Sequence, residues 1–499
     1  VSGQLVPVHA GEPDGRRVVA NTLAFLAGAA ASELDPQPTL RIGHSIGNSV
    51  YFDLGETDPQ RRDDTVARIE QQMRELAESD QSILLEQMSY LDALSWFNTH
   101  EPSTALLLAH RNDRAITCVR LGRYRALYHG PLCPTAGMIR AFSLQPHMNG
   151  FALCFPDPQT PEAPSAFTDR PILSDIYREY RNWGSILELS SAGALNRLAA
   201  EPDAIADFVV VNEALHDRKI ARIADSIAER GKSVRVILIA GPSSSGKTTF
   251  TKKLAIQLRV LGVRPVTIGL DDYFVPRART PLDESGEPDF ESLGAIDVEL
   301  LNQNLLDLFA GKTVDIPQFD FRIGDRSFGR QYTRLDQGDV LVMEGIHGLN
   351  PDLTPRIPEE ATFRIYVSAL TQLNLDDHSR IATTDNRLIR RIVRDHQFRG
   401  HSAARSLELW PKVRRGEDRN IFPYQNSADA VFNSALDYEL GVLKPVVTPL
   451  LQEVKPDNPG YSEATRLLLF LRHFAPIREG LVPARSILRE FLGNSAFRY

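Results

Sequence analysis

The second half of the chain alternates continuous apolar segments with helical segments. Four apolar runs have the length of strands: Val234–Ala240, Val266–Leu270, Val340–Met343 and Phe363–Val367. Strands without polar alternation are typical of a parallel sheet that is covered by helices on both faces. Residues 207–455 are therefore predicted to form an α/β domain.

The first half shows a mixed pattern instead. One stretch has apolar residues at helical spacing: Val66, Ile69, Met73 and Leu76. Two others have the length and composition of strands: Ala115–Leu121 and Phe151–Phe155. This pattern predicts an α+β domain over residues 1–155. Residues 156–206 follow as a proline-containing helical linker, and residues 456–499 form a C-terminal helical segment.

The composition of the chain is that of an ordinary globular protein. Its 499 residues exceed what one core usually serves, and its net charge of −8 provides no general attraction to nucleic acid or anionic lipid. Three cysteines do not make a disulfide framework and fit a reducing compartment, so a cytoplasmic location is expected. The apolar run Thr22–Ala31 is too short to span a bilayer, and no membrane partner is expected. Whether Val1 is the native start stays open.

A phosphate-binding loop follows the first apolar run of the α/β domain. The segment Gly241-Pro-Ser-Ser-Ser-Gly-Lys-Thr matches G-x-x-x-x-G-K-[ST], between a predicted strand and a predicted helix. In this motif, Lys247 reaches the β- and γ-phosphates of a nucleotide and Thr248 places its hydroxyl on Mg²⁺. The predicted nucleotide-binding residues are Gly241, Ser243, Ser244, Ser245, Gly246, Lys247, Thr248 and Thr249.

Two further apolar strands end in acidic residues. Asp271 and Asp272 follow one strand, and Glu344 follows another. Ligands bind at the carboxyl ends of strands in open α/β sheets, so Asp271 can accept the proton of an acceptor hydroxyl. The alternative is a turn or helix-capping aspartate. Thr248, Asp271 and Glu344 together supply the oxygen ligands that Mg²⁺ prefers.

A run of arginines lies on a predicted helix between Arg387 and Arg399. Arg387, Arg391 and Arg394 share one face of this helix. Such a run is usually a solvated face, but kinases need cations that close over the transferring phosphate. We favour a lid, in which Arg391 and Arg394 act in catalysis.

Several motifs together resemble the uridine kinase and phosphoribulokinase family. They occur in the family's order between Val234 and Leu440: GPSSSGKTT, LDDYF, PQFDF, MEGIHGL, RLIRRIVRD and SADAVFNSALDYEL. The resemblance implies ATP and Mg²⁺ as cofactors and a small-molecule acceptor. It implies that Asp271 is the catalytic base, that Glu344 assists Mg²⁺, and that lid arginines grip phosphates. These arginines correspond to Arg391, Arg394 and Arg399.

The acceptor site departs from the pattern of uridine–cytidine kinases. Their acid that follows a phenylalanine corresponds to Glu291, and the aromatic residue of their P-x-Y-D-F segment corresponds to Phe319. Gly324 lies near the place of their histidine, and His401 replaces a further lid arginine. The implied acceptor-binding residues are Asp271, Tyr273, Phe290, Glu291 and Phe319. Phosphoryl transfer is thus expected, while recognition of a pyrimidine stays open.

The first domain resembles the editing-type second additional domain of threonyl-tRNA synthetases. The similar segments are Arg41–Asn48, the helix around Ile69–Leu76, and His129–Phe142. Of the family's four H-x-x-x-H and C-x-x-x-H positions, His44 is retained, and the other three are Asn48, Tyr128 and Leu132. A zinc site at these positions is not expected, because leucine cannot ligate a metal.

Fusions of this kind form a bacterial nucleoside kinase family, which the tail Arg485–Gly493 also resembles. The first domain is then a binding or regulatory module. We therefore expect a nucleoside 5′-kinase. A kinase for a sugar phosphate or vitamin is the first alternative, and an ATP-gated switch that binds RNA or protein is the second. RNA contact by the first domain and homo-oligomer formation both stay open.

Overall fold

The computed structural model describes residues 8–498, apart from 170, 188, 190, 284–285 and 321–322. Val1 and Phe321, the last residue of the PQFDF motif, lie outside the described residues. The chain divides into two compact units, which are described separately here. The first comprises Val1–Pro202, Thr371–Ala382 and Arg466–Ala475, and the second comprises Asp203–Leu370, Thr383–Thr465 and Pro476–Tyr499. The boundaries predicted at 155, 206 and 455 stay predictions.

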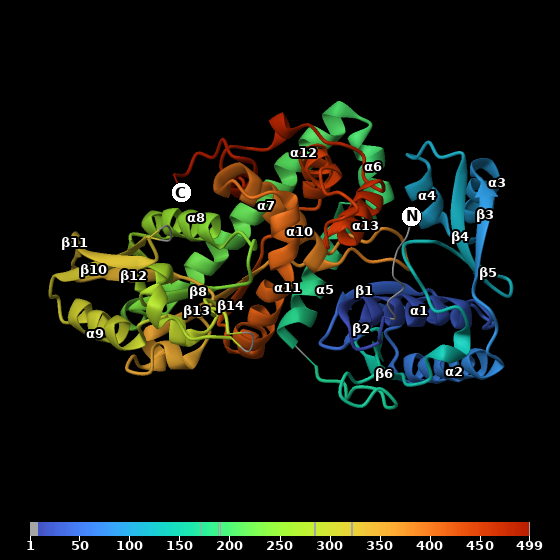
Figure 1. The fold of residues 1–499 in the computed structure, drawn as a ribbon, viewed down its shortest axis with the longest axis horizontal. Helices are drawn as coiled ribbons and strands as arrows, with labels where there is room; N and C mark the ends of the chain where they lie inside the picture. The colour runs from blue at the N-terminus through green and yellow to red at the C-terminus, as the bar shows by residue number, and fades with distance from the viewer. Residues whose placement is uncertain are drawn as a thin grey trace. The chain divides into compact units, whose positions relative to one another are not determined.

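The described part of the second unit is built around a parallel sheet of five strands (Figure 1). In spatial order these are β14 (Ala430–Asn433), β13 (Thr362–Ser368), β8 (Val236–Ala240), β12 (Asp339–Glu344) and β9 (Arg264–Gly269). All neighbouring pairs are parallel. The predicted α/β architecture is therefore confirmed, and β14 is a strand that the apolar pattern did not indicate.

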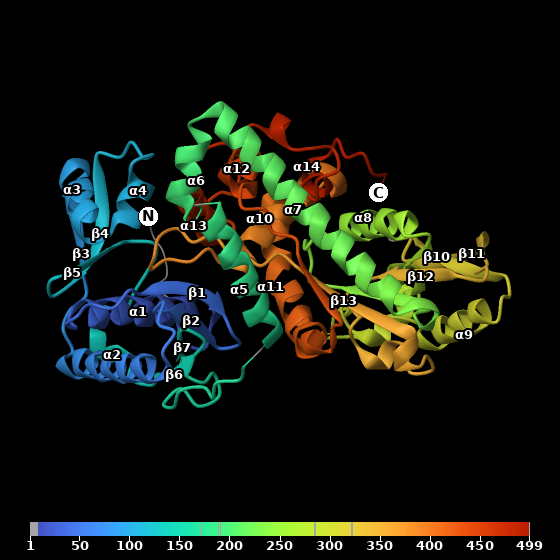
Figure 2. The same cartoon turned by 180° about the vertical axis from the view of Figure 1, so that it is seen from behind.

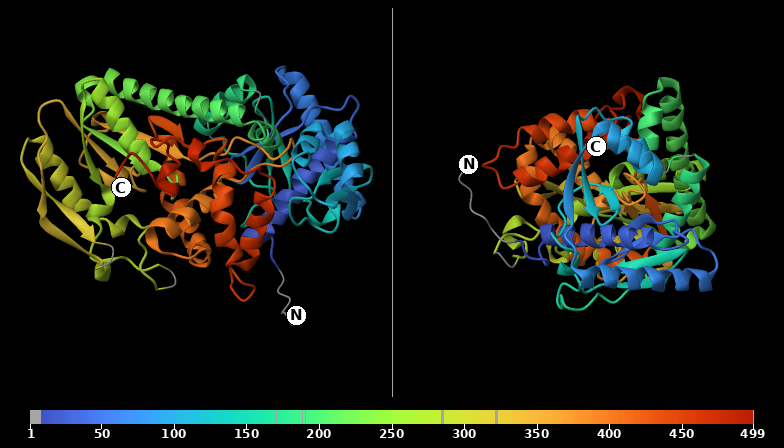
Figure 3. Two further views of the ribbon diagram at one scale, coloured as in Figure 1. Left: turned by 90° about the horizontal axis from the view of Figure 1, so that it is seen from above. Right: turned by 90° about the vertical axis from the view of Figure 1, so that its right-hand side faces the viewer.

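Helices cover both faces of this sheet. On one face, Leu238 and Met343 pack with Leu301 and Leu305 of α9 (Val298–Phe309). On the other face, α8 (Lys247–Val260) and α7 (Pro202–Glu229) contribute aromatic rings that contact β14. Figure 2 shows α7 in front of this face, and Figure 3 shows it side-on as one uninterrupted helix. Burial of both faces explains why β8 is entirely apolar and the middle of β12 is apolar, whereas the edge strand β9 is mostly exposed or half-buried.

The remaining elements of the second unit lie around the carboxyl ends of the strands or extend from the sheet. A short 3₁₀ helix follows β9, and β10 pairs with β11 as an antiparallel hairpin. The bounds are Leu270–Tyr273 for this 3₁₀ helix, Val314–Asp320 for β10, Asp325–Thr333 for β11, Thr383–Arg399 for α10, Ala403–Asn420 for α11, Glu439–Gln452 for α12 and Arg489–Leu492 for α14. Helix α13 (Tyr461–Leu471) contributes its final residues to the first unit.

The first unit is an α+β structure, as predicted. Its described residues form two antiparallel sheets with the orders β1-β2-β7-β6 and β3-β4-β5. The strands are β1 (Arg41–Ser45), β2 (Ser49–Asp53), β3 (Leu84–Ser89), β4 (Ala115–Leu121), β5 (Tyr124–Leu127), β6 (Ser143–His147) and β7 (Gly150–Cys154). The helices are α1 (Pro13–Ser32), α2 (Pro59–Ser79), α3 (Tyr90–His100), α4 (Pro102–Leu108), α5 (Pro171–Ile186) and α6 (Ala192–Ala199).

Helices α1 and α2 supply most of the helical part of the core of the first unit. Leu23 and Leu26 of α1 and Ile69 and Met73 of α2 are completely buried together with Phe52 of β2. The apolar run Thr22–Ala31 thus belongs to a core helix. Among the described residues, no helix combines the length and the apolar character that a bilayer crossing requires.

Candidate active site

The loop between β8 and α8 has the conformation that its glycines permit. Ser244 and Gly246 have φ angles of 59° and 79°, in the left-handed region. A Cβ atom on Gly241 would lie 2.0 Å from the carbonyl oxygen of Val367, and one on Gly246 would lie 2.5 Å from Cγ2 of Ile487. Close packing therefore requires both glycines of the motif, and the left-handed backbone geometry at Gly246 favours glycine as well.

Lys247 begins helix α8 and turns back onto its own loop. Its Nζ donates hydrogen bonds to the carbonyl oxygens of Gly241, at 2.8 Å, and Pro242, at 3.1 Å. Burial lowers the pKa of Lys247, and the nearby Glu344 carboxylate partly offsets this effect. The ammonium group is thus held at the mouth of the loop, where a terminal phosphate of a nucleotide would bind.

Thr248 and Glu344 meet at the carboxyl ends of the central strands. The hydroxyl of Thr248 donates to Oε1 of Glu344 at 2.9 Å. Oε2 of Glu344 is buried, and it has no hydrogen-bond partner among the described residues. Burial raises the pKa of this carboxyl to about 7. A buried oxygen without a partner, beside a hydroxyl, fits a divalent cation.

The protein groups would not hold this cation alone. The described residues contain no cluster of three or more histidine, cysteine or acidic side chains that could bind a metal ion. Mg²⁺ commonly takes one or two protein ligands and completes its shell with water and substrate phosphates. Thr248 and Glu344 would therefore hold Mg²⁺ together with a bound nucleotide. The part predicted for Asp271 in metal binding stays a prediction.

Two adjacent aspartates at the end of β9 have different environments. Oδ1 of Asp272 accepts a hydrogen bond from the backbone N–H of Phe319 at 3.4 Å. The side chain of Asp271 forms no hydrogen bond or ion pair with any residue in the described part of the chain. It is exposed, yet surrounding protein atoms desolvate it enough to raise its pKa, and Lys247 opposes this rise. Asp271 is therefore the aspartate that is available to a ligand.

Aromatic rings and one further acid lie beside these aspartates. Phe274 contacts the rings of Phe319 and Phe290, with centroids 5.6 and 6.5 Å apart. Phe290 is 37% exposed, so it presents apolar surface to solvent. Burial raises the pKa of the adjacent Glu291 to about 7, with Glu417 adding to the effect. The predicted acceptor residues Phe290, Glu291 and Phe319 thus belong to one region.

Tyr273, which was also predicted to bind the acceptor, lies in the core instead. It is 1% exposed, and its hydroxyl accepts a hydrogen bond from Nδ2 of Asn304 at 3.1 Å. Burial raises its pKa to about 12. The side chain supports the 3₁₀ helix that carries Asp271. Its direct contact with an acceptor stays an untested prediction.

Three arginines of α10 converge on a single carboxylate. Asp395 forms ion pairs with Arg391, Arg394 and Arg399, at 3.2, 2.8 and 3.6 Å. Burial would raise the pKa of Asp395, but the guanidinium groups outweigh it and the pKa is lowered. Arg391 also donates to the hydroxyl of Ser243 at 2.9 Å. Three guanidinium groups therefore share one carboxylate, which leaves net positive charge beside the phosphate-binding loop. A lid over a phosphate would require such a charge.

Arg387 of the same helix has a different position from the one expected of a lid residue. It is 1% exposed and forms an ion pair with Glu417 of α11. Its Nε donates to the carbonyl oxygen of Ser243 at 2.9 Å, and Glu417 accepts from the backbone N–H of Ser243 at 2.9 Å. The pair therefore holds both backbone groups of one loop residue.

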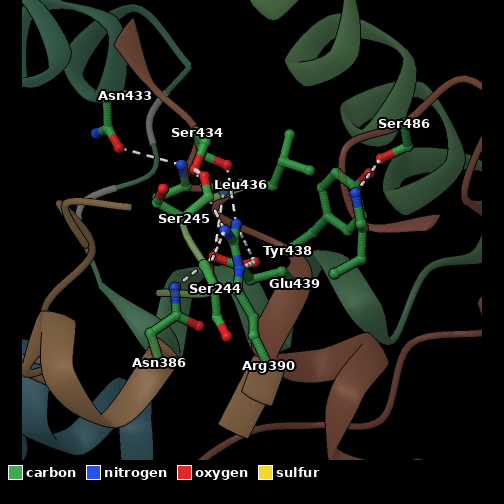
Figure 4. Close-up of polar contacts among 12 residues, drawn as sticks. Ser244, Ser245, Asn386, Arg390, Asn433, Ser434, Leu436, Tyr438, Glu439 and Ser486 are labelled. Carbon is green, nitrogen blue, oxygen red and sulfur yellow. Dashed lines mark hydrogen bonds and ion pairs between the residues drawn. The ribbon is translucent and has the colours of Figure 1, made fainter. Parts of the chain in front are cut away.

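A second buried pair holds the next part of the loop (Figure 4). Arg390 is fully buried and bonds to Glu439 of α12, with Nη2 2.6 Å from Oε2. The guanidinium also donates to the carbonyl oxygen of Ser434 at 2.9 Å and to that of Ser244 at 3.4 Å. The hydroxyl of Ser434 donates to the carbonyl oxygen of Ser245 at 2.5 Å. Helix α10 and the segment after β14 thus hold the loop through its backbone carbonyl oxygens.

Sequence reasoning did not find these supporting acids. Glu417 lies outside the recognised motifs, and Glu439 lies within SADAVFNSALDYEL, but no role was assigned to it. A third acid, Glu490 of α14, bonds to Thr249. The contacts of these acids have no local signal, because their partners lie far away in the chain.

His44, Asn48 and His129 of the first unit have different surroundings. His44 is 7% exposed, its ring nitrogens have no hydrogen-bond partner among the described residues, and burial lowers its pKa to about 3. Asn48 donates to the carbonyl oxygen of Pro156 at 2.9 Å. Nε2 of His129 lies 3.2 Å from Asp376 instead. The resemblance of this unit to an editing domain stays a prediction.

Comparison with known proteins finds one family model and several similar proteins. The model of the phosphoribulokinase/uridine kinase family matches residues 236–440. A uridine kinase of Macrococcus caseolyticus is 30% identical over 197 residues, which cover 39% of this chain and 86% of that protein. One of Halalkalibacterium halodurans is 28% identical over 202 residues, which cover 40% and 86%. A solved structure from Bacillus stearothermophilus, described as a possible uridine kinase, is 20% identical with a TM-score of 0.28, and the match covers 43% of this chain and 98% of that one.

Proposed function

Since the chain belongs to the phosphoribulokinase/uridine kinase family, we propose that it transfers the γ-phosphoryl group of ATP to the 5′-hydroxyl of a nucleoside. Membership of this family supports phosphotransferase activity on a small molecule. The nucleoside as acceptor is suggested by the uridine kinases among the relatives. The observation that carries the proposal is the carboxylate of Asp271, which forms no hydrogen bond or ion pair with the described residues and lies close enough to Lys247 for the two charges to affect each other.

In the proposed reaction, Asp271 accepts the proton of the acceptor hydroxyl. The hydroxyl oxygen forms a bond to the γ-phosphorus, the bond from that phosphorus to the bridging oxygen breaks, and ADP leaves. Lys247 and the arginines of α10 stabilise the negative charge of the transferring group. Mg²⁺, when bound by Thr248 and Glu344 with the nucleotide, neutralises phosphate charge. Phe290, Phe319 and Glu291 are the proposed contacts to the acceptor.

A kinase for another small hydroxyl compound is the second candidate. Glu291 stands where the related kinases have an acid for the ribose, and its raised pKa of about 7 makes it partly protonated at neutral pH. A protonated carboxyl donates as well as accepts, so it can also bind a group that only accepts, such as a carbonyl or phosphate oxygen, in place of a ribose hydroxyl. Incubation with ATP, Mg²⁺ and a panel of nucleosides, sugar phosphates and vitamins, followed by mass spectrometry of the products, separates the two candidates.

The role of Asp271 is tested by comparing Asp271→Asn with Asp272→Asn. Loss of the general base should lower kcat by about a hundredfold or more in Asp271→Asn, while the Kd for ATP changes little. Asp272→Asn is the matched control, because its side chain is engaged by the backbone of Phe319. The same loss in Asp272→Asn instead of Asp271→Asn would assign the base to Asp272, and a panel in which no compound gains phosphate would refute the proposed activity.

A further inference from the structure

The C-terminal segment of the second unit packs directly on the phosphate-binding loop. Ile487, Leu488 and Phe491 are completely buried, and Leu492 is 4% exposed. Cγ2 of Ile487 occupies the space beside Gly246 that a side chain would otherwise take. The ring of Phe491 lies 5.1 Å from the guanidinium carbon of Arg390. These contacts anchor α14 firmly at the amino end of α8.

Glu490 of this segment bonds to a part of α8 that binds phosphate in loops of this kind. Its Oε2 accepts from the backbone N–H of Thr249 at 3.0 Å and from the hydroxyl of Thr249 at 2.7 Å. Thr249 is the third residue of α8, so its N–H is one of the first-turn amides without a partner inside the helix. Such amides, at the positive end of the helix dipole, form the anion site of a phosphate-binding loop.

Glu490 differs from the other acid at this loop in its ion pairs. Among the described residues, no lysine or arginine forms an ion pair with it, whereas Glu417, which bonds to the same loop, is paired with Arg387 and Arg414. Its negative charge acts on Lys247 and Glu344: it opposes the burial that lowers the pKa of Lys247, and it adds to the burial that raises the pKa of Glu344. Glu417 is therefore held by direct ion pairs, while Glu490 lies in a site for anions without a direct ion pair to any described residue.

We propose that Glu490 is an intramolecular competitor of the nucleotide. Its carboxylate occupies the Thr249 donors in the nucleotide-free chain, and it must leave when a phosphate group binds there. Only the side chain needs to move, because Glu490 is less buried than the Phe491 and Leu492 that anchor the helix. The inference rests on the proposed nucleotide binding by this loop. It assigns to the C-terminal segment a restraint on nucleotide affinity.

The test is the affinity of the full chain for ADP with Mg²⁺, measured by calorimetry for the wild type and Glu490→Gln. Glutamine has the same shape and keeps an acceptor for Thr249, so the variant is expected to fold with an unchanged melting temperature. Removal of the competing charge should lower the Kd for ADP roughly tenfold. Inorganic pyrophosphate, as a second probe, should show a similar gain, because the competition concerns phosphate and not the base.

Glu453→Gln is the matched control. It removes the same charge from an exposed position at the end of α12, and it should leave the Kd for ADP unchanged. Equal or weaker binding of ADP by Glu490→Gln would overturn the inference and leave Glu490 as a cap of α8. In that case, binding of ADP by the wild type would still uphold the nucleotide site. Absence of ADP binding in both proteins would overturn the nucleotide site and this inference together.

Discussion

Glu344 should make the stability of the second unit depend on pH. Burial raises its pKa from 4.5 to about 7. Between these values the folded chain keeps a proton that the unfolded chain has released, so the free energy of unfolding falls as the pH rises. At about 1.4 kcal/mol per pH unit, this loss amounts to at most about 3 kcal/mol by pH 7, and it changes little above that pH.

Glu344→Gln removes this ionisation and keeps an acceptor for the hydroxyl of Thr248. At pH 5 the variant and the wild type should unfold at similar urea concentrations. At pH 8 the variant should be more stable by up to about 3 kcal/mol, because only the wild type keeps a buried charge there. Urea unfolding followed by pulse proteolysis, with peptides of the second unit measured by mass spectrometry, gives these values.

Glu453→Gln again serves as the control, since this exposed glutamate should show no such difference. A stability difference between Glu344→Gln and the wild type that is constant from pH 5 to 8 would refute the reasoning. The same ionisation should govern metal binding, because a cation binds the carboxylate and not the acid. With a pKa of about 7, the ionised fraction of Glu344 falls about tenfold from pH 8 to 6, and the affinity for Mg²⁺ with ADP should fall similarly.

Two further predictions concern the phosphate-binding loop. Arg390→Met leaves the buried carboxylate of Glu439 without its partner, so urea unfolding should show a loss of about 3–5 kcal/mol. Arg390→Met combined with Glu439→Leu should recover most of it, and a double variant as unstable as the single one would contradict the ion-pair explanation. Lys247→Ala should lower kcat by two orders of magnitude or more, because its charge acts mainly on the transferring phosphate. Steady-state kinetics measures this, and an unchanged kcat would contradict that role.

The sequence predicted the parts of the fold that have a local pattern. Four strands were indicated because their residues are apolar on both faces. Strand β14 was not, because it has only four residues and Ala430 and Val431 are half-buried. The meeting of β9 and β12 at their carboxyl ends could also be inferred, and the parallel register indeed places Glu344 beside Gly269.

The arginines of α10 show where this reasoning stops. Helical spacing grouped Arg387 with Arg391 and Arg394 on one face, but spacing does not tell a solvated guanidinium from a buried one. Arg387 and Arg390 are buried because Glu417 and Glu439 neutralise them. Those acids come from other helices, and their contacts depend on the tertiary fold. No pattern within a short window could have identified them.

The buried pairs indicate that the loop is already ordered before a nucleotide arrives. Arg387 and Glu417 hold the two backbone groups of Ser243, and Arg390 binds the carbonyl oxygen of Ser244. Binding energy is then not needed to order the loop, which favours affinity. Glu490 opposes that advantage, because its carboxylate already satisfies the donors of Thr249. A rigid loop cannot relax around this carboxylate. Removal of the charge at position 490 should therefore remove the repulsion of a bound phosphate, and almost all of that change should appear as higher phosphate affinity.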